Sequence, residues 1–217
     1  MKRFLFFVII IYSATIVKAQ IKYSIEGAPQ FSPDISWRVG GNIEMPISKR
    51  FSIVSGLHWS DRHRTKKNTT TITSDQEKEI RTKESSFNAN FITIPVRLAI
   101  RIGTLSNYKN KWRVLVGPYI AYGISGNGNI KTSINGDENK EDVKTFGNEG
   151  LYRTRWDYGL SSEIQYIHKD HFNMGIFMEN GFRDLYKSDN AFESIMDDLF
   201  VVSKINITVG FSVGYIF

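Results

Sequence analysis

The chain has 217 residues, 23% charged and 41% hydrophobic, a balance that excludes a disordered chain and a multi-span helical membrane protein. It contains no cysteine, which excludes disulfides, thiolate metal sites and cysteine nucleophiles. The net charge is +6, and the 17 glycines, 10 tyrosines and 15 phenylalanines favour β structure.

The N-terminal segment has the three-part form of a secretory signal peptide. Lys2 and Arg3 form a positive start, residues 4–11 are apolar throughout, and Val17-Lys18-Ala19 offers small residues at a cleavage site. A membrane-anchoring helix, the alternative, needs about 20 apolar residues, and this core is shorter. We expect cleavage of residues 1–19, export, and a single domain over 20–217. Because the removed segment has three basic residues and no acidic one, the net charge falls to +3, and nucleic acid is not an expected partner.

Apolar and polar side chains alternate with a period of two through most of the remaining chain, and helical periodicity is nearly absent. In the last segment every odd position from Ile205 to Phe217 is apolar, whereas the even positions are polar or small except Ile216. Such alternation is typical of strands in a sheet with one apolar face. The segments that show it are 21–28, 36–45, 51–61, 87–102, 112–124, 153–167, 171–183 and 204–217.

The connections between these eight segments alternate in length. Short ones are 46–50, 103–111 and 168–171; long ones are 62–86, 125–152 and 184–203; 29–35 is intermediate. An even number of strands of roughly ten residues with such connections predicts an all-β fold, an eight-stranded antiparallel up-and-down transmembrane β-barrel. The short connections would be periplasmic turns, and the long ones extracellular loops.

A soluble up-and-down barrel of the lipocalin kind is the competing fold, and its apolar face would point inward. The aromatic residues favour the membrane barrel, because all four tryptophans fall on the apolar face near strand ends. We expect one girdle on the outer side and one on the periplasmic side. Their members would be Trp37, Trp59, Trp156, Tyr122 and Phe182 outside, and Trp112, Phe51, Tyr166, Phe172, Tyr215 and Phe217 at the periplasm. Leu160, Val116 and Ile94 should face lipid near mid-membrane, and Ser161 the lumen.

The polar face of the strands collects charge. Its basic members are Lys22, Arg38, Arg97, Arg101, Arg113, Arg153, Arg155, Arg183 and Lys204, and its acidic members are Glu26, Glu44, Asp157, Glu163 and Glu179. Eight strands leave an interior that side chains just fill, and buried charges must pair. We therefore expect a lumen plugged by ion pairs, with Arg97 within reach of Glu163, Glu179 or Glu26. A narrow ion path is the alternative.

Two strand motifs resemble those of a known family. The segment FITIPVRLA at 91–99 is similar to the Ile-Pro strand of the PorT-like outer-membrane β-barrels of Gram-negative bacteria, often described as "porin family" proteins, and GPYIAYGISG at 117–126 is similar to the strand that follows it. Residues 156–183 and 209–217 fit the last three strands of those proteins. The resemblance implies a barrel in the cell outer membrane with no enzyme activity.

The densest group of potentially catalytic residues is His58, Ser60, Asp61 and His63. On a strand His58 and Ser60 would point inward, with His58 at the outer rim of the lumen. No Gly-x-Ser-x-Gly elbow surrounds Ser60. We expect His58 to be a structural residue bonded to Asp157 or a backbone group, and assign no catalytic residue.

Metal and cofactor sites are not expected either. Asp137, Asn139, Glu141 and Asp142 lack the spacing of a calcium loop. The preceding Asn135-Gly136 pair instead predicts a hairpin turn, flanked by strands at 130–134 and 143–146. His168 and His171 flank a turn and do not have the spacing of two ligands on one helix.

The loops and the C-terminus indicate the expected partners. Loop 62–86 has a net charge of +3 and loop 184–203 of −4, and the latter has a helical stripe that predicts an amphipathic helix at about 190–200. These two loops and 125–152 would contact an envelope protein. Phe217 resembles the terminal signal read by the barrel assembly machinery. The function we expect is a plugged structural or accessory barrel in outer-membrane lipid; a lipid-modifying enzyme near His58 and a narrow channel remain alternatives.

Overall fold

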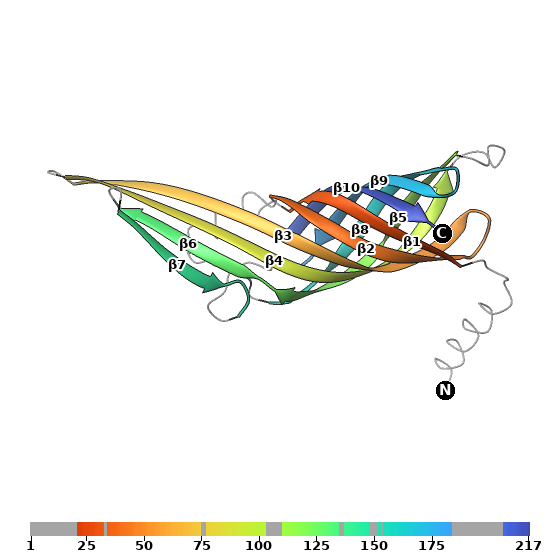
Figure 1. Ribbon diagram of the computed structural model, residues 1–217, viewed down its shortest axis with the longest axis horizontal. Coiled ribbons are helices and arrows are strands. Elements are labelled where there is room, and N and C mark those ends of the chain that lie inside the picture. Colours follow the sequence, from red (N-terminus) through yellow and green to blue (C-terminus); the bar gives the residue numbers. More distant parts are fainter. Residues whose placement is uncertain are drawn as a thin grey trace, which may run out of the picture.

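A computed structural model describes residues 21–32, 34–74, 77–102, 110–134, 137–147, 152, 154–183 and 206–217. The predicted signal peptide and the helix expected at 190–200 lie outside these residues. The described chain forms ten strands (Figure 1): β1 Lys22–Phe31, β2 Ile35–Pro46, β3 Phe51–Ser74, β4 Glu77–Ile102, β5 Asn110–Ser125, β6 Asn127–Ile134, β7 Asp137–Lys144, β8 Trp156–His168, β9 Phe172–Gly181 and β10 Asn206–Ile216. Within the described ranges there is no helix long and apolar enough to cross a membrane.

Eight of these strands close into an antiparallel barrel, as predicted. The order around the barrel is β1, β2, β3, β4, β5, β8, β9 and β10, and β10 pairs back onto β1. The closing pair runs from Ser24 opposite Ile216 to Phe31 opposite Val209, so the last strand meets the first where the alternation required it. Closure leaves no open strand edge within the barrel, which is the condition for a sheet in lipid.

The apolar face of the barrel points outward, which excludes the lipocalin-like alternative. Leu160 is 47% exposed and its neighbour Ser161 is fully buried, and Ile94 and Val116 are exposed like Leu160. The four tryptophans are all exposed on the same face. A barrel with apolar residues outside and charged residues inside is stable only in a membrane, since water would solvate the wrong face.

Aromatic side chains form clusters near both ends of the barrel strands. Towards one end, the rings of Tyr122 and Trp156 lie 4.7 Å apart. At the other end Trp112 lies 5.0 Å from Tyr166, and Tyr215 contacts Phe172 at 5.3 Å and Phe217 at 5.2 Å. The exposed Phe51 and Phe182 also lie at strand ends. These positions confirm the predicted sorting into two girdles.

One end of the barrel has short connections and is called the turn end below. His168 and His171 are joined by Lys169 and Asp170, whose φ values are 49° and 63°, and the N–H of His171 donates to the carbonyl of His168 at 3.2 Å. Two successive positive φ values define the turn that best matches the twist of a hairpin.

The opposite, extended end carries a sheet that projects well beyond the barrel (Figure 1). β3 and β4 stay paired past Asp61 and Asn90 as far as Ser74 and Glu77, and β6 and β7 pair alongside β4. We call residues 63–74, 77–88, 127–134 and 137–144 the outer sheet. The expectation of a loop at 62–86 was therefore wrong. Residues 69–73 are mostly threonine, a β-branched residue that favours strands. Because β3 and β4 are already paired within the barrel, their pairing continues into water without an apolar face.

The β6–β7 hairpin confirms the predicted turn at 135–136, because Ile134 and Asp137 pair on either side of it. Its returning strand begins at Asp137 and not, as expected, at 143. Where β4 changes partner from β5 to β6, the register is irregular between Asn90 and Phe91. Gly126 is required at this junction, since a Cβ there would lie 2.5 Å from the carbonyl oxygen of Asn88.

Candidate functional site

The lumen contains a network of charged side chains, and its first layer lies near the turn end. Glu44 of β2 accepts hydrogen bonds from Arg113 of β5 at 2.6 Å and from the hydroxyl of Ser52 of β3 at 2.7 Å. Arg101 of β4 lies 3.7 Å from the same carboxylate. The Nε of Arg113 also donates to Gln165 at 2.6 Å, which links this layer to the next one.

The second layer is centred on Arg97 of β4 and Glu163 of β8. Their side chains are fully buried and form an ion pair at 2.6 Å, which confirms the expected partner of Arg97. Gln165 and Ser212 donate to the other oxygen of Glu163 at 2.6 and 2.7 Å. A buried carboxylate with both oxygens bonded is stabilised against the cost of its desolvation.

The third layer joins β1, β2, β3 and β9. Arg38 donates to Glu26 and to Glu179, each at 3.0 Å, and its guanidinium lies 3.5 Å from the centroid of the Phe177 ring. Asn42 donates to the second oxygen of Glu26 at 3.0 Å.

His58 belongs to this third layer, so the prediction of a rim position was wrong. The residue is fully buried, and its Nε2 lies 2.9 Å from Asn42 and 3.5 Å from Glu26. The expected partner Asp157 lies in another layer. Strand parity gives the face of a residue but not its depth, and β3 extends so far outward that His58 falls well inside the barrel.

The fourth layer contains Arg62, which the sequence reasoning assigned to a loop. Arg62 is 2% exposed and donates to Asp157 at 2.9 Å, with Glu179 at 3.8 Å. Its guanidinium stacks 4.3 Å from the centroid of Phe91, and Tyr119 donates to Asp157 at 3.1 Å. The alternation of β3 could have identified Arg62, because 52, 54, 58, 60 and 62 share one parity.

Aromatic residues cover the fourth layer towards the extended end. Phe91, Phe146 and Tyr152 are buried together, with ring centroids 5.3 to 5.9 Å apart. Arg155 lies 4.8 Å above Phe146 and donates to the carbonyls of Gly123 and Ile124. These contacts place an apolar cluster between the fourth layer and the extended end.

The four layers form one connected network to which every barrel strand contributes. Five arginines face five carboxylates: Arg38, Arg62, Arg97, Arg101 and Arg113 against Glu26, Glu44, Asp157, Glu163 and Glu179. The formal charges of these residues therefore cancel. Such an arrangement fixes the register of the strands, and each charge among these ten residues faces a charge of opposite sign.

The remaining charges predicted to face the lumen are placed differently. Lys22 is half-buried, whereas Arg155 and Arg183 are exposed. Arg155 precedes β8, and Arg183 follows β9, so strand parity does not apply to either residue. Arg153 and Lys204 lie outside the described residues.

The potentially catalytic group is divided by the sheet. Ser60 is buried on the lumen side, while Asp61 and His63 have the opposite parity, and in the described chain no hydrogen bond joins His58 to Ser60. The structure thus does not bring these residues into one site.

The residues weighed as metal ligands also lie apart. Within the described ranges no group of three or more histidine or carboxylate residues could hold a metal ion. Asp137, Asn139 and Glu141 lie at alternate positions of β7, so they share one face but are spread about 6–7 Å apart along the strand, whereas Asp142 lies on the other face. His171 contacts the carbonyl of Ile216 at 3.2 Å through Nδ1 and stacks on Tyr215.

Comparison with known proteins gives a family match over most of the chain. A family model described as "Outer membrane protein beta-barrel domain" matches residues 12–187. No curated protein matches significantly. Among solved structures, the chain is similar to the N-terminal β-barrel domain of Pseudomonas aeruginosa OprF, with 11% identity, coverage of 91% of this chain and 96% of that one, and a TM-score of 0.34. It is also similar to Ail, the attachment invasion locus protein of Yersinia pestis, with 10% identity, coverage of 93% and 100%, and a TM-score of 0.38.

Proposed function

Since the chain belongs to the family of the outer membrane protein β-barrel domain, we propose that it is a sealed, non-enzymatic barrel that acts through its outer sheet as a structural or accessory protein of the cell envelope. The observation that carries this proposal is the continuous network in the lumen. The side chains of Arg97 and Glu163 at its centre have no exposed surface. A wide channel needs a continuous aqueous path, and these side chains occupy that path.

Bilayer conductance tests the sealed lumen. We expect purified protein to give no steady conductance in a planar bilayer, and the double variant Arg97→Ala/Glu163→Ala to give frequent openings, because the largest side chains at the centre are shortened. A matched control, Lys140→Ala/Glu141→Ala on β7, should stay silent. Heat-modifiable gel migration would show that each sample is folded. Steady conductance of the wild-type chain would contradict the proposal and favour the narrow channel.

The absence of enzyme activity is also a proposal, supported by the enclosure of His58 within the network. A lipid-modifying enzyme needs its base open to the membrane or the rim, and His58 is fully buried. We expect His58→Ala and Ser60→Ala to leave the acylation of lipid A and the phospholipid composition of the cells unchanged by mass spectrometry. A shift in either composition, with the barrel still folded, would favour the enzyme.

The direction of the barrel completes the proposal: the outer sheet faces the exterior and the turn end faces the periplasm of a Gram-negative cell, after cleavage of the predicted signal peptide. The short turns and the extended end support this direction. The chain has no cysteine, so single cysteines report the side directly. A membrane-impermeant maleimide should label Lys140→Cys on intact cells and label Lys49→Cys only after lysis. The reverse labelling pattern would show that the barrel has the opposite orientation in the membrane.

Within the family, we place the chain in the PorT-like group. The support is local: Gly117 lies where a Cβ would approach the carbonyl oxygen of Val96 to 2.1 Å, so the Gly-Pro-Tyr strand must carry glycine beside the Ile-Pro strand. Ser55 donates to the carbonyl of Pro95 at 2.9 Å at the same place. Gly117→Val should therefore abolish heat-modifiable migration, while Gly27→Val, where a Cβ meets nothing within 4 Å, should keep it.

A further inference from the structure

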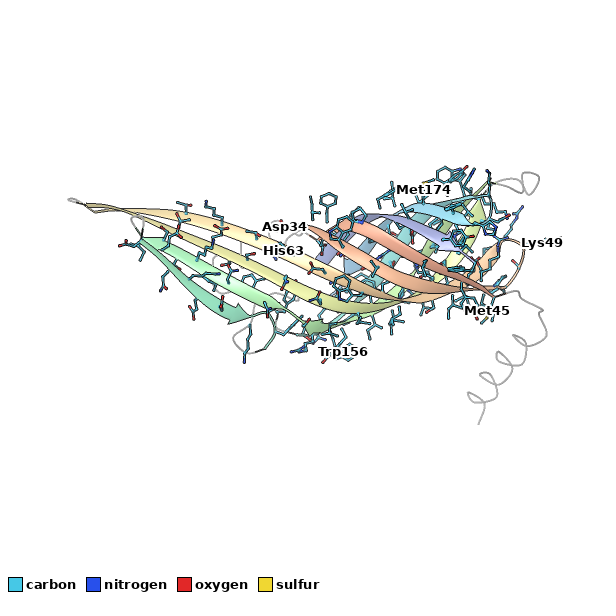
Figure 2. The ribbon with its side chains drawn as sticks, viewed as in Figure 1. Asp34, Met45, Lys49, His63, Trp156 and Met174 are labelled. Carbon is cyan, nitrogen blue, oxygen red and sulfur yellow. The ribbon has the colours of Figure 1, made fainter. Side chains whose placement is uncertain are left out.

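A polar cavity of about 560 Å³ lies on the outer sheet at the place where β4 changes partner from β5 to β6. Figure 2 labels His63, one of its lining residues, beside Asp34 at the point where β3 leaves the barrel. The lining is drawn from four strands. Its principal side chains are His63, Asn88, Asn127, Asn129, Asp142 and Lys144.

These side chains share the face of the sheet that continues the lipid-facing side of the barrel. His63 is paired with Asn88, and Asn129 is paired with Asp142, so the members of each pair point the same way. Phe87 on the adjoining position of β4 is buried on the opposite face. The cavity therefore lies outside the lumen and is separate from the charged network.

The frame of the cavity is fixed by hydrogen bonds of Asn88. Its side-chain oxygen accepts from the backbone N–H of Asn127 at 2.9 Å, and its carbonyl oxygen accepts from the hydroxyl of Thr145 at 2.9 Å. Behind the cavity, on the opposite face of the sheet, Gly128 allows the Phe87 ring to pack against β6, because a Cβ at Gly128 would lie 2.2 Å from that ring. The cavity is thus preformed and does not depend on a ligand to assemble it.

The chemistry of the lining selects the class of ligand. Each asparagine side chain offers both donors and an acceptor, Asp142 adds acceptors, and Lys144 adds donors. The side chains of Asp142 and Lys144 are exposed and that of Asn129 is partly exposed, so their donors and acceptors can reach a ligand in the cavity. Vicinal hydroxyls of a sugar both donate and accept and match this mixture. A phosphate only accepts, and Asp142 would repel it.

The height of the cavity indicates where such a sugar would come from. His63 lies four residues beyond Trp59, the girdle residue of β3, and Asn88 lies four residues from Ile92, the partner of Trp59. At about 3.3 Å per residue and a strand tilt near 40°, this places the cavity roughly 10 Å beyond the girdle. Phospholipid headgroups occupy only about 5–7 Å of each leaflet, so a taller, saccharide headgroup is the one that reaches it.

We infer that this cavity is a binding site for a saccharide, supplied by the headgroup of a glycolipid in the outer leaflet around the barrel. The inference goes beyond the proposed function and takes from it only the direction of the barrel. Bound headgroups would hold the outer sheet close to the membrane surface.

Binding to the purified full chain in detergent micelles tests this inference. The probe is lipopolysaccharide with a short core, and the affinity is measured by isothermal titration calorimetry. Asn129→Ala/Asp142→Ala removes an amide and a carboxylate from the cavity, and should weaken binding about tenfold or more, as the loss of two hydrogen bonds predicts. The control Asn139→Ala/Glu141→Ala makes the same chemical change on the opposite face of β7 and should bind like wild type.

Two further probes separate the possible sources. The delipidated core oligosaccharide should bind at the same site, with the same sensitivity to Asn129→Ala/Asp142→Ala but more weakly than the whole lipid, because the acyl chains no longer contact the barrel. Equal affinity for both probes would contradict the claim that the saccharide is the headgroup of a membrane lipid. Displacement of the lipid by inorganic phosphate alone, or equal loss of binding in the cavity variant and its control, would overturn the saccharide site itself. Conductance of the lumen would not affect any of these outcomes.

Discussion

The lumen and the outer sheet are both rich in charge, but they use it in opposite ways. In the lumen the five arginines and five carboxylates are paired, and nearly all are buried. On β7, six of eight residues are charged and seven are exposed, and no ion pair holds them within the described part of the chain. The comparison shows that burial, and not the number of charges, decides whether an ionic group is essential to the fold.

The reason is the cost of removing a charge from water. A charge in the lumen is stabilised only by its partners, so each residue there depends on several others. A charge on the outer sheet is solvated whether or not it has a partner, and exposed pairs contribute little. Changes of the same chemistry should therefore have very different effects in the two regions, and the following predictions measure that difference.

The largest effect is expected when one partner of a buried pair is removed. Glu163→Ala leaves Arg97, Gln165 and Ser212 without their common acceptor, and should lower the free energy of unfolding by about 3–5 kcal/mol. Glu141→Ala on the outer sheet should change it by less than about 0.5 kcal/mol. Urea unfolding from lipid vesicles measures both values. Equal losses would remove the distinction between the two regions.

The second prediction compares two exposed apolar residues, one in lipid and one in water. Leu160→Arg places a charge near mid-membrane and should cost about 2–4 kcal/mol. Ile134→Arg, at the end of β6, has a similar exposed fraction, 39% against 47%, but lies beyond the membrane and should cost little. The same unfolding assay applies. If Ile134→Arg were the more costly of the two, the outer sheet would have to lie in the membrane.

A smaller thermodynamic effect is expected at the end of the chain. Phe217 donates its N–H to the carbonyl of Tyr23 at 2.8 Å and its ring contacts Tyr215, an aromatic pair worth roughly 0.5–1.5 kcal/mol. We propose that the barrel assembly machinery also recognises this residue. Deletion of Phe217 should then reduce the yield of heat-modifiable barrel in membranes by more than the stability loss explains, and Phe217→Tyr should restore the yield. Wild-type yield after deletion would show that the residue is dispensable.

The smallest effect is expected from shortening the outer sheet itself. Replacement of residues 67–84 by Asn-Gly leaves Lys66 opposite Ser85 in its present register, keeps the pairing of β4 with β6 from Ser85 to Phe87, and leaves all four lumen layers intact. The unfolding free energy of the barrel should change by less than about 1 kcal/mol, because distant sites act independently. A large loss, measured by the same urea titration, would show that the two regions fold as one unit.

The fold was predictable because alternation reports directly on a barrel with two chemically distinct faces. The lumen-facing set around Arg97 followed from parity alone. The ion-pair partner of Arg97 could not be predicted in the same way. The stagger between strands decides whether Glu26, Glu163 or Glu179 lies at the height of Arg97, and sequence patterns do not reveal that stagger. The outer sheet was missed for a different reason: outside the membrane a strand needs no apolar face, so the signal ends at Asp61 while the strand continues. The cavity near His63 depends on that missed sheet.

The uninterrupted course of β3 and β4 has a mechanical consequence. These strands have 24 and 26 residues, so each spans roughly 80 Å from the turn end to the tip. A force that pulls the tip away from the membrane acts on both strands in the same direction and does not separate them. The load passes to the hydrogen bonds that β3 makes with β2 and β4 makes with β5, which lie across the pull and must break together. The tip is therefore held by all the hydrogen bonds of two strand pairs, β2–β3 and β4–β5, which together resist sliding of β3 and β4 along the barrel.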